Sequence, residues 1–257
     1  GIFIPSYIMF NRRQNMKQIL VFIFCAIPLL LLAQQPQFRS YTTKDGLSNN
    51  YVNQIAQDKT GYLWIATRMG LNRFNGSEFK TYYNNPTDTN SIPFNLILSV
   101  FVDSHNTLWL GTYGEKVCSF NISTEKFTQY EFEKNINPSF IDVFSFFENK
   151  NGELCISTGF GYFKLQANTF VKFSNSPAIF APNKIRVQNS VWECTSYGIK
   201  LSNEKGLITW YSAENTPEIA SNSFQSVIKD KNNNVWYCTH GGGIVTASLQ
   251  HEHLKQY

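Results

Sequence analysis

The sequence repeats itself five times, in segments that cover residues 61–67, 106–112, 152–158, 189–195 and 233–239. One large residue anchors nearly every copy; the anchors are Trp64, Trp109, Cys155, Trp192 and Trp236, spaced 45, 46, 37 and 44 residues apart. A Thr stands three residues after each anchor, and six residues before it stand Asp58, Asp103, Asn149, Arg186 and Asp230. Self-similarity at such a period is the signature of a repeat architecture, in which every copy is one supersecondary unit.

Each copy is long enough for four short strands. In the first copy we expect them over residues 51–57, 62–67, 70–74 and 78–82. The turn that begins at Asp58 ends at Gly61, as a type I turn prefers, and Asn75-Gly76 is a strong hairpin signal. No sustained helical periodicity follows residue 34. Four strands per copy predict an all-β fold, a β-propeller with four-stranded blades; a β-solenoid is the alternative, but its coils are shorter.

The second strand of each copy indicates how neighbouring blades pack. In the first copy Leu63 and Ile65 share one face of the strand, while Trp64 and Ala66 share the other. Both faces are apolar, as expected of a sheet held between two other sheets. The residue two after the anchor is always small (Ala66, Gly111, Ser157, Cys194 and Cys238), which lets a large ring of a facing sheet interdigitate. We assign the Asp of the first turn a structural role.

The limits of the repeats predict about five blades, near residues 48–88, 91–134, 138–175, 180–215 and 221–257. The segment 38–41 resembles the fourth strands at 79–82 and 127–130, yet it precedes the first complete copy. It competes with 253–257 for the outer edge of the fifth blade. We therefore expect 38–41 to be an orphan outer strand and the chain, with domain 35–257, to be a fragment of a seven-bladed ring. Closure of five blades, with 38–41 in place of 253–257, is the alternative.

An interrupted ring leaves terminal sheet faces without neighbours. We expect these bare faces to carry residues such as Leu63, Ile65, Val235 and Tyr237, and residues 38–257 alone to be poorly stable and prone to aggregate.

The first 34 residues look like an export signal. Arg12, Arg13 and Lys17 precede an apolar run over 19–33, and a polar stretch follows Ala33, where we expect cleavage. A retained membrane anchor is the alternative; residues before Met16 are interpreted as an upstream extension. The net charge of +4 falls to +1 without the three leader cations, which argues against a nucleic-acid binder.

The chain carries no catalytic or metal-binding signature. No nucleophile elbow, zinc-binding helix or phosphate loop occurs, and 230–234 holds too few acids for calcium. His251 and His253 could bind a metal weakly, but an exposed polar pair is the preferred interpretation. The sequence thus predicts no catalytic residue, no metal and no cofactor. Four cysteines follow the leader (Cys118, Cys155, Cys194 and Cys238); buried free thiols are favoured over disulfides, which export would permit.

Ligands of propellers bind mostly where the loops between the second and third strands meet those between blades. At or near these loops stand Arg68, Tyr113, Glu115, Tyr197 and His240, our candidate ligand-binding residues. Aromatic and hydrogen-bonding side chains suit a sugar; the other interpretation is that they are ordinary loop tips.

The segments 41–48 and 55–74 resemble the two-component regulator propeller, the periplasmic sensor of hybrid histidine kinases in Bacteroidetes. Cys155 departs from the family's Trp position, and the fourth copy lacks the Asp and Gly of the first turn. The resemblance implies two seven-bladed propellers, a β-sandwich and one membrane span, with kinase and DNA-binding parts downstream. It also implies that this region lies in the periplasm, belongs to a homodimer anchored in the inner membrane, and contacts no nucleic acid. The implied ligand is an oligosaccharide from glycan breakdown, and the implied output is expression of polysaccharide-utilisation genes.

Two other functions remain open from the sequence. One is a secreted propeller lyase, similar to streptogramin lyase, with His240 and Glu115 as acid–base pair. The other is a scaffold that docks proteins.

Overall fold

The computed structural model describes residues 36–114, 116–134, 141–175, 184–187, 189–195 and 197–248. The expected leader, Glu115 and the segment 253–257 lie outside them. The described residues form twenty strands and one short 3-10 helix, Thr43–Asp45, within the compact unit Gln37–Tyr257. No described helix is long and apolar enough to cross a bilayer.

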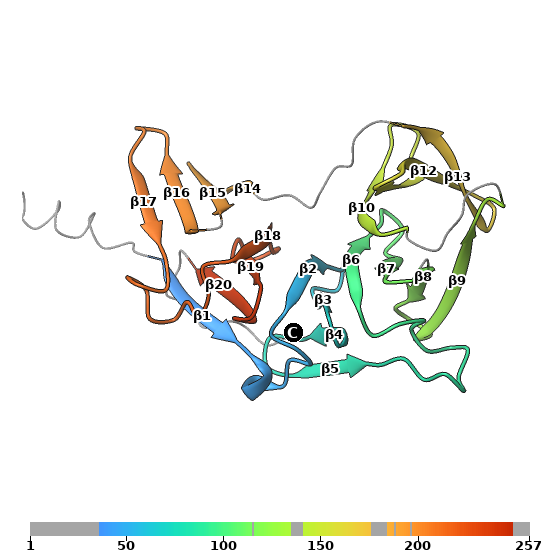
Figure 1. The fold of residues 1–257 in the computed structure, drawn as a ribbon. Coiled ribbons are helices and arrows are strands. Elements are labelled where there is room, and N and C mark those ends of the chain that lie inside the picture. Colours follow the sequence, from blue (N-terminus) through green and yellow to red (C-terminus); the bar gives the residue numbers. More distant parts are fainter. Residues whose placement is uncertain are drawn as a thin grey trace, which may run out of the picture. The chain divides into compact units, whose positions relative to one another are not determined.

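The strands form five four-strand units, which confirms the all-β propeller fold (Figure 1). Three of these blades are separate sheets, whereas blades 2 and 3 join into one eight-stranded sheet through a short parallel pairing of their outer strands at Glu131–Phe132 and Thr169–Phe170. Blade 1 is β2 (Val52–Gln57), β3 (Leu63–Thr67), β4 (Gly70–Phe74) and β5 (Phe79–Tyr82). Blade 2 is β6 (Ile97–Val102), β7 (Leu108–Thr112), β8 (Lys116–Asn121) and β9 (Lys126–Phe132). Blade 3 is β10 (Val143–Glu148), β11 (Leu154–Thr158), β12 (Gly161–Gln166) and β13 (Thr169–Ser174). Blade 4 is β14 (Lys184–Val187), β15 (Ser190–Thr195), β16 (Gly198–Asn203) and β17 (Ile208–Tyr211). Blade 5 is β18 (Phe224–Lys229), β19 (Val235–Thr239), β20 (Ile244–Ser248) and β1 (Gln37–Tyr41).

The repeated residues make two kinds of polar contact within the blades. In blade 1, Trp64 Nε1 donates to Asp58 Oδ2 at 2.8 Å, while the other oxygen of Asp58 accepts the backbone N–H of Gly61. The same contact joins Trp109 to Asp103 and Trp236 to Asp230, each at 2.8 Å. The repeated Thr binds the turn that follows: Thr67 Oγ1 donates to the carbonyl of Gly70 at 2.8 Å. These contacts satisfy buried donors and fix two turns, so they explain why the pattern recurs.

The strand β1 is the outer strand of blade 5. It pairs antiparallel with β20 over its whole length, from Gln37 opposite Ser248 to Tyr41 opposite Ile244 (Figure 1). Gly243 takes a positive φ of 79°, and a Cβ there would collide with the carbonyl oxygen of Tyr41. Outer-strand carbonyls crowd Gly70, Gly161 and Gly198 of other blades in the same way. The segment 38–41 thus takes the outer edge of the fifth blade, which was the alternative expectation, and it is not an orphan strand, since the open edge of β20 provides its hydrogen bonds.

Four hydrophobic clusters lie between blades. They join blade 1 with blade 2, blade 2 with blade 3, blade 4 with blade 5, and blade 5 with blade 1. Leu63 and Ile65, which we expected to be bare, are buried between blades 1 and 5; Val235 and Tyr237 are buried between blades 4 and 5. The expectation that these residues are bare is wrong, because blade 5 covers Leu63 and Ile65, and blade 4 covers Val235 and Tyr237. The poor stability expected of residues 38–257 alone stays a prediction. Among the described residues no such cluster joins blades 3 and 4.

Candidate functional site

A β-bulge recurs at the same position of four inner strands. The pairing register shifts around Asn53 in β2, Leu98 in β6, Phe144 in β10 and Gln225 in β18. Each of these residues stands 11 positions before the anchor of its blade. A bulge turns the extra residue out of the normal alternation, so it can re-aim a side chain. All four line one cavity, which the bulges therefore build.

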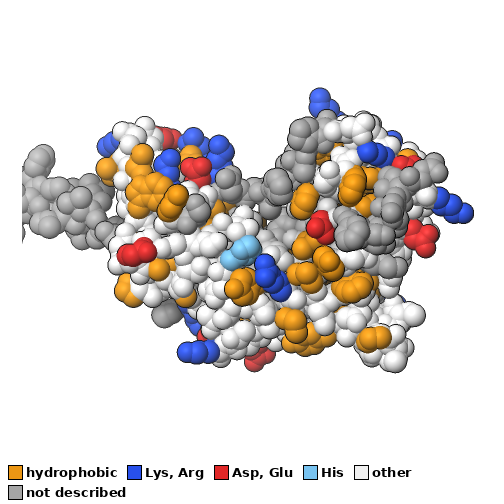
Figure 2. Space-filling view, in the orientation of Figure 1, with side chains coloured by type: hydrophobic (Ala, Val, Ile, Leu, Met, Phe, Trp, Pro, Cys, Tyr) orange, Lys and Arg blue, Asp and Glu red, His pale blue; other side chains and the backbone are white. Residues whose placement is uncertain are grey.

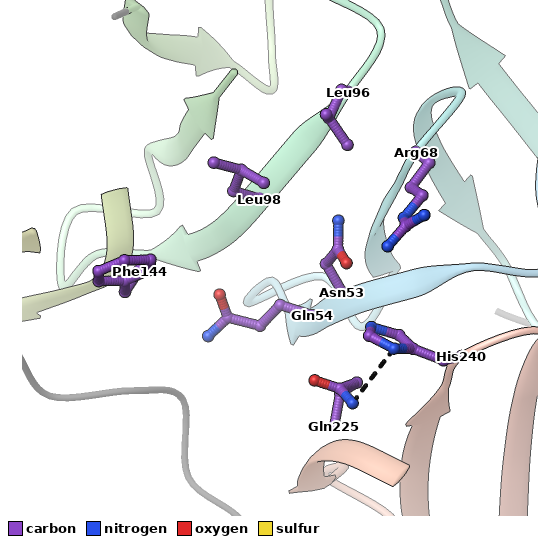
Figure 3. A pocket seen from close by; sticks show the side chains of 8 residues that line it. All are labelled: Asn53, Gln54, Arg68, Leu96, Leu98, Phe144, Gln225 and His240. Carbon is purple, nitrogen blue, oxygen red and sulfur yellow. Dashed lines mark hydrogen bonds between the residues drawn. The ribbon is translucent and has the colours of Figure 1, made fainter. Parts of the chain in front are cut away.

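The cavity has a volume of about 580 Å³ and is lined by four blades. Its lining is Asn53, Gln54, Arg68, Leu96, Leu98, Phe144, Gln225 and His240 (Figure 3). Arg68 follows β3 and His240 follows β19, at equivalent hairpins of blades 1 and 5. In Figure 3 the polar side chains of Arg68, Asn53, His240 and Gln225 lie on one side, whereas Leu98 and Phe144 lie on the other. One polar and one apolar wall are what a ligand with hydroxyl groups and an apolar face requires.

The polar wall is held by contacts with neighbouring blades. Asn53 Nδ2 donates to the carbonyl of Ile97 at 2.6 Å, and Gln54 Oε1 accepts the backbone N–H of Val100 at 3.0 Å. These bonds cross from blade 1 to blade 2. The first strands thus fix part of the wall before any ligand binds, which reduces the entropy lost on binding.

Arg68 and His240 meet through Tyr51. The guanidinium carbon of Arg68 lies 4.6 Å from the centre of the Tyr51 ring, and the rings of Tyr51 and His240 are 5.9 Å apart. The backbones of Tyr51 and His240 also form an isolated antiparallel bridge. Burial, and then the nearby Arg68, lower the pKa of His240 from its usual value of 6.5, so the ring is neutral at pH 7. In the same orientation as Figure 1, Figure 2 shows a His and a basic side chain side by side, with hydrophobic side chains around them.

The ring of His240 has a partner on its Nδ1 side. Gln225 Nε2 lies 3.4 Å from His240 Nδ1, so the amide can donate to a neutral imidazole there. In that tautomer the Nε2–H of His240 remains a donor. The wall then presents N–H groups from Arg68 and His240.

The structure brings together two of the five residues that the sequence nominated, Arg68 and His240. Tyr113 and Tyr197 stand at hairpin tips with 49% and 79% of their surface exposed, and they are not part of the cavity lining. Glu115 lies outside the described residues. The sequence analysis missed the four bulge residues, although their constant distance from the anchor was a usable signal.

Hairpin tips of four blades also display a large apolar side chain. These side chains are Met69, Tyr113, Phe160 and Tyr197, each one or two residues after the repeated Thr. In three of these hairpins the backbone N–H of the tip residue donates to Oγ1 of the repeated Thr. The pairs are Met69 with Thr67, Phe160 with Thr158, and Tyr197 with Thr195. The fixed turn explains why the tip side chains point outward.

The cysteines and potential metal ligands of the described chain form no reactive site. The four cysteines of the described chain are free and buried, as expected. Burial raises the pKa of each thiol, to about 12 for Cys238, so they behave as small apolar residues. No group of three potential metal ligands occurs among the described residues. His251 and His253 lie outside them.

Comparison with known proteins gives the fold class first. The chain superposes on a streptogramin B lyase with a TM-score of 0.52 and 13% identity, covering 84% of this chain and 98% of that one. At this identity the likeness shows a β-propeller fold and nothing about activity. A second solved structure, the extracellular domain assigned to a hybrid two-component system of B. thetaiotaomicron, gives a TM-score of 0.46 at 22% identity, over 84% of this chain and 42% of that one.

Two stretches of the sequence match a family model. Residues 46–69 and 91–114 match the model of the two component regulator propeller. A stretch of 81 residues is 46% identical to histidine kinase P4 of Formosa agariphila. This match covers 32% of the present chain and 6% of the kinase, so the chain spans a small part of that relative.

Proposed function

We propose that this chain is the ligand-sensing part of a two-component system histidine kinase, exported from the cytoplasm, and that its ligand is an oligosaccharide from glycan breakdown. The bulge-lined cavity carries the proposal. Its Phe144 and Leu98 offer an apolar wall to a sugar ring, while Asn53, Arg68 and His240 offer hydrogen bonds to hydroxyl groups. The family repeats and the likeness to a histidine kinase support the signalling role.

The proposal extends to parts beyond this chain. Further blades and a kinase in the same polypeptide would receive the signal, in a homodimer anchored in the inner membrane. The output would be transcription of polysaccharide-utilisation genes, with no nucleic-acid contact by this region.

Isothermal titration calorimetry against a panel of plant, algal and host oligosaccharides tests the sensor function. The full chain should bind at least one of them, and Phe144→Ala should weaken that binding because it removes the apolar wall. Tyr197→Ala is the matched control, since Tyr197 is exposed and outside the cavity. Thermal melts of both variants check folding. If the wild-type chain binds no oligosaccharide of the panel, the proposal is contradicted and a protein-docking scaffold is favoured.

The cavity does not favour a lyase. His240 would need a carboxylate as its partner in acid–base catalysis, and the described lining contains none. We therefore propose binding without turnover.

A further inference from the structure

The charge of the cavity's described lining is positive and rests on Arg68, because His240 is neutral at pH 7. Arg68 and His240 are the ionisable side chains of its described lining, and neither Asp nor Glu contributes. A second cavity, of about 690 Å³, runs along the inner strands and shares Gln54 with the first. Its described lining includes Lys229 and likewise no carboxylate. A concave surface with cations and without acids concentrates anions near it.

Arg68 is positioned to bind an anion directly. Its guanidinium rests on the Tyr51 ring, and no described carboxylate forms an ion pair with it, whereas Arg73 and Arg186 both have such partners. Stacking on a ring occupies the face of the guanidinium and leaves the N–H groups at its edge available. These groups match two oxygens of a carboxylate or sulfate at once.

Neighbouring donors complete the environment. The neutral ring of His240 bonds to Gln225 through Nδ1, which leaves its Nε2–H as a second donor near Arg68. In Figure 3 the Asn53 amide lies beside the Arg68 and His240 side chains, toward the middle of the cavity. The apolar wall of Leu98 and Phe144 lies opposite, where the uncharged part of a ligand fits.

We propose that the cavity is a site for an acidic sugar, whose carboxylate or sulfate binds Arg68 and His240 while its ring lies against Leu98 and Phe144. The proposal names the ligand class of the site described under Proposed function and rests on it. Neutral oligosaccharides would bind the same cavity less tightly because they leave Arg68 without a counter-charge.

A direct test needs no knowledge of the natural sugar. Sodium sulfate is titrated into the full chain while the ring resonances of His240 are followed by NMR, with sodium chloride at equal ionic strength as control. We expect a saturable shift with sulfate that is absent with chloride and lost in Arg68→Gln. Lys80→Gln is the matched cation control, because Lys80 is bound to Glu125 away from the cavity. A response to sulfate that is absent, or unchanged in Arg68→Gln, overturns the proposal.

Two calorimetric comparisons then show whether the anion is a carboxylate or a sulfate of a sugar. They also distinguish failure of the acidic-sugar site from failure of the sensor function. The first compares α-1,4-linked trigalacturonate with its carboxyl-reduced counterpart; the second compares a sulfated galacto-oligosaccharide with the unsulfated sugar. We expect the acidic member of at least one pair to bind about ten-fold tighter, the scale of one solvent-screened charge-assisted hydrogen bond. Arg68→Gln should abolish that preference.

Neutral sugars that bind as well as acidic ones refute the acidic-sugar site but leave the sensor function intact. Sulfate binding at Arg68 without binding of any oligosaccharide refutes the sensor function and leaves an anion site.

Discussion

Blades 1, 2 and 5 differ from blades 3 and 4 in how they use the anchor position. In the first three the anchor is a Trp whose indole N–H is bound to the Asp of the first turn. In blade 4 Trp192 is buried, but its Nε1 has no hydrogen-bond partner among the residues that the structure describes. In blade 3 the anchor is Cys155, and Asn149 of the first turn binds Glu153 instead.

The turn length explains blade 4. Trp64 pairs with Ala56, eight residues before it, whereas Trp192 pairs with Ile185, seven residues before it. The shorter hairpin places Val187, not Arg186, at the position equivalent to Asp58. Arg186 instead forms a loose ion pair with Glu204 at 3.8 Å, and no described residue of this turn provides an acceptor for the indole N–H.

The neighbours explain blade 3. Each anchor Trp belongs to a cluster with an adjacent blade, but Cys155 belongs to none of the described clusters. Beside it on the same sheet face, Lys164 binds Glu153 at 3.1 Å. In blade 4 the face opposite Trp192 carries a similar pair, Lys200 and Glu193, at 3.6 Å. Glu193, one residue after the anchor, stands where the other blades have Ile65, Leu110, Ile156 and Tyr237, so blade 4 places a charge at an otherwise apolar position. Among the described residues the anchor that is not a Trp is also the one that joins no cluster between blades, which teaches that a large ring is favoured where a neighbouring blade covers it.

The largest effect should come from the anchors themselves. Trp64→Ala should lower the free energy of unfolding by about 3–5 kcal/mol, since Trp64 is fully buried between blades 1 and 2. Cys155→Ala, the same position in blade 3, should cost about 1 kcal/mol, because it removes one sulfur atom. Urea denaturation followed by Trp fluorescence and circular dichroism measures both. An equal loss of unfolding free energy in both variants would contradict the difference between the anchors of blades 1 and 3.

Removal of the carboxylate of the first turn should have the second-largest effect on the free energy of unfolding. Asp58→Ala should cost about 2–4 kcal/mol because it leaves the N–H groups of Trp64 and Tyr62 without their acceptor and removes the side-chain acceptor of the Gly61 N–H. Arg186→Ala, six residues before the anchor of blade 4, should change stability by less than about 0.5 kcal/mol, since its ion pair is exposed. The same urea titration applies, and a costly Arg186→Ala would show that blade 4 uses its arginine structurally.

A substitution that disturbs the pairing of β1 with blade 5 should have the third-largest effect on the free energy of unfolding. Gly243→Ala should cost about 1–3 kcal/mol, because the residue has a positive φ and the new Cβ collides with the Tyr41 carbonyl. Gly152→Ala, in the first turn of blade 3, also has a positive φ but meets no atom, so it should cost about 1 kcal/mol. Hydrogen exchange of the β1 and β20 amides should speed up in Gly243→Ala alone. Unchanged protection there would argue that β1 is not held by this turn.

The exposed ion pair of blade 3 should give the smallest effect, visible as a pH dependence. Hydrogen bonds from Asn149 and Lys164 lower the pKa of Glu153 below its usual 4.5. The folded state therefore gains stability from this carboxylate above pH 4.5 and loses it as the pH falls through the lowered pKa. The difference in melting temperature between wild type and Glu153→Gln should shrink from pH 6 to pH 3. Lys164→Met should behave alike, and a difference that does not vary with pH would contradict the assignment.

The sequence by itself determined the unit of this fold. The spacing of Trp64, Trp109 and Trp236, with Asp six residues before and Thr three after, predicted four-stranded blades and the strands of the first one to within a residue. It could do so because these contacts are local: the turn, the anchor and the hairpin lie within one short stretch of chain. The repeat also predicted the hairpins that carry Arg68 and His240.

Only the tertiary structure decided which units meet. The segment 38–41 reads as an outer strand in the sequence, and the edge of the fifth blade is one of the two places that the sequence leaves open for it. Its pairing with β20, about 200 residues away, was decided only by the tertiary structure. The cavity depends on the same long-range assembly, because Arg68 and His240 come from blades 1 and 5. Its four bulge residues are chemically dissimilar, so their shared role emerges only when the inner strands lie side by side. Strand pairing and sheet packing reward contacts between distant residues, and those contacts have no signature in either segment taken alone.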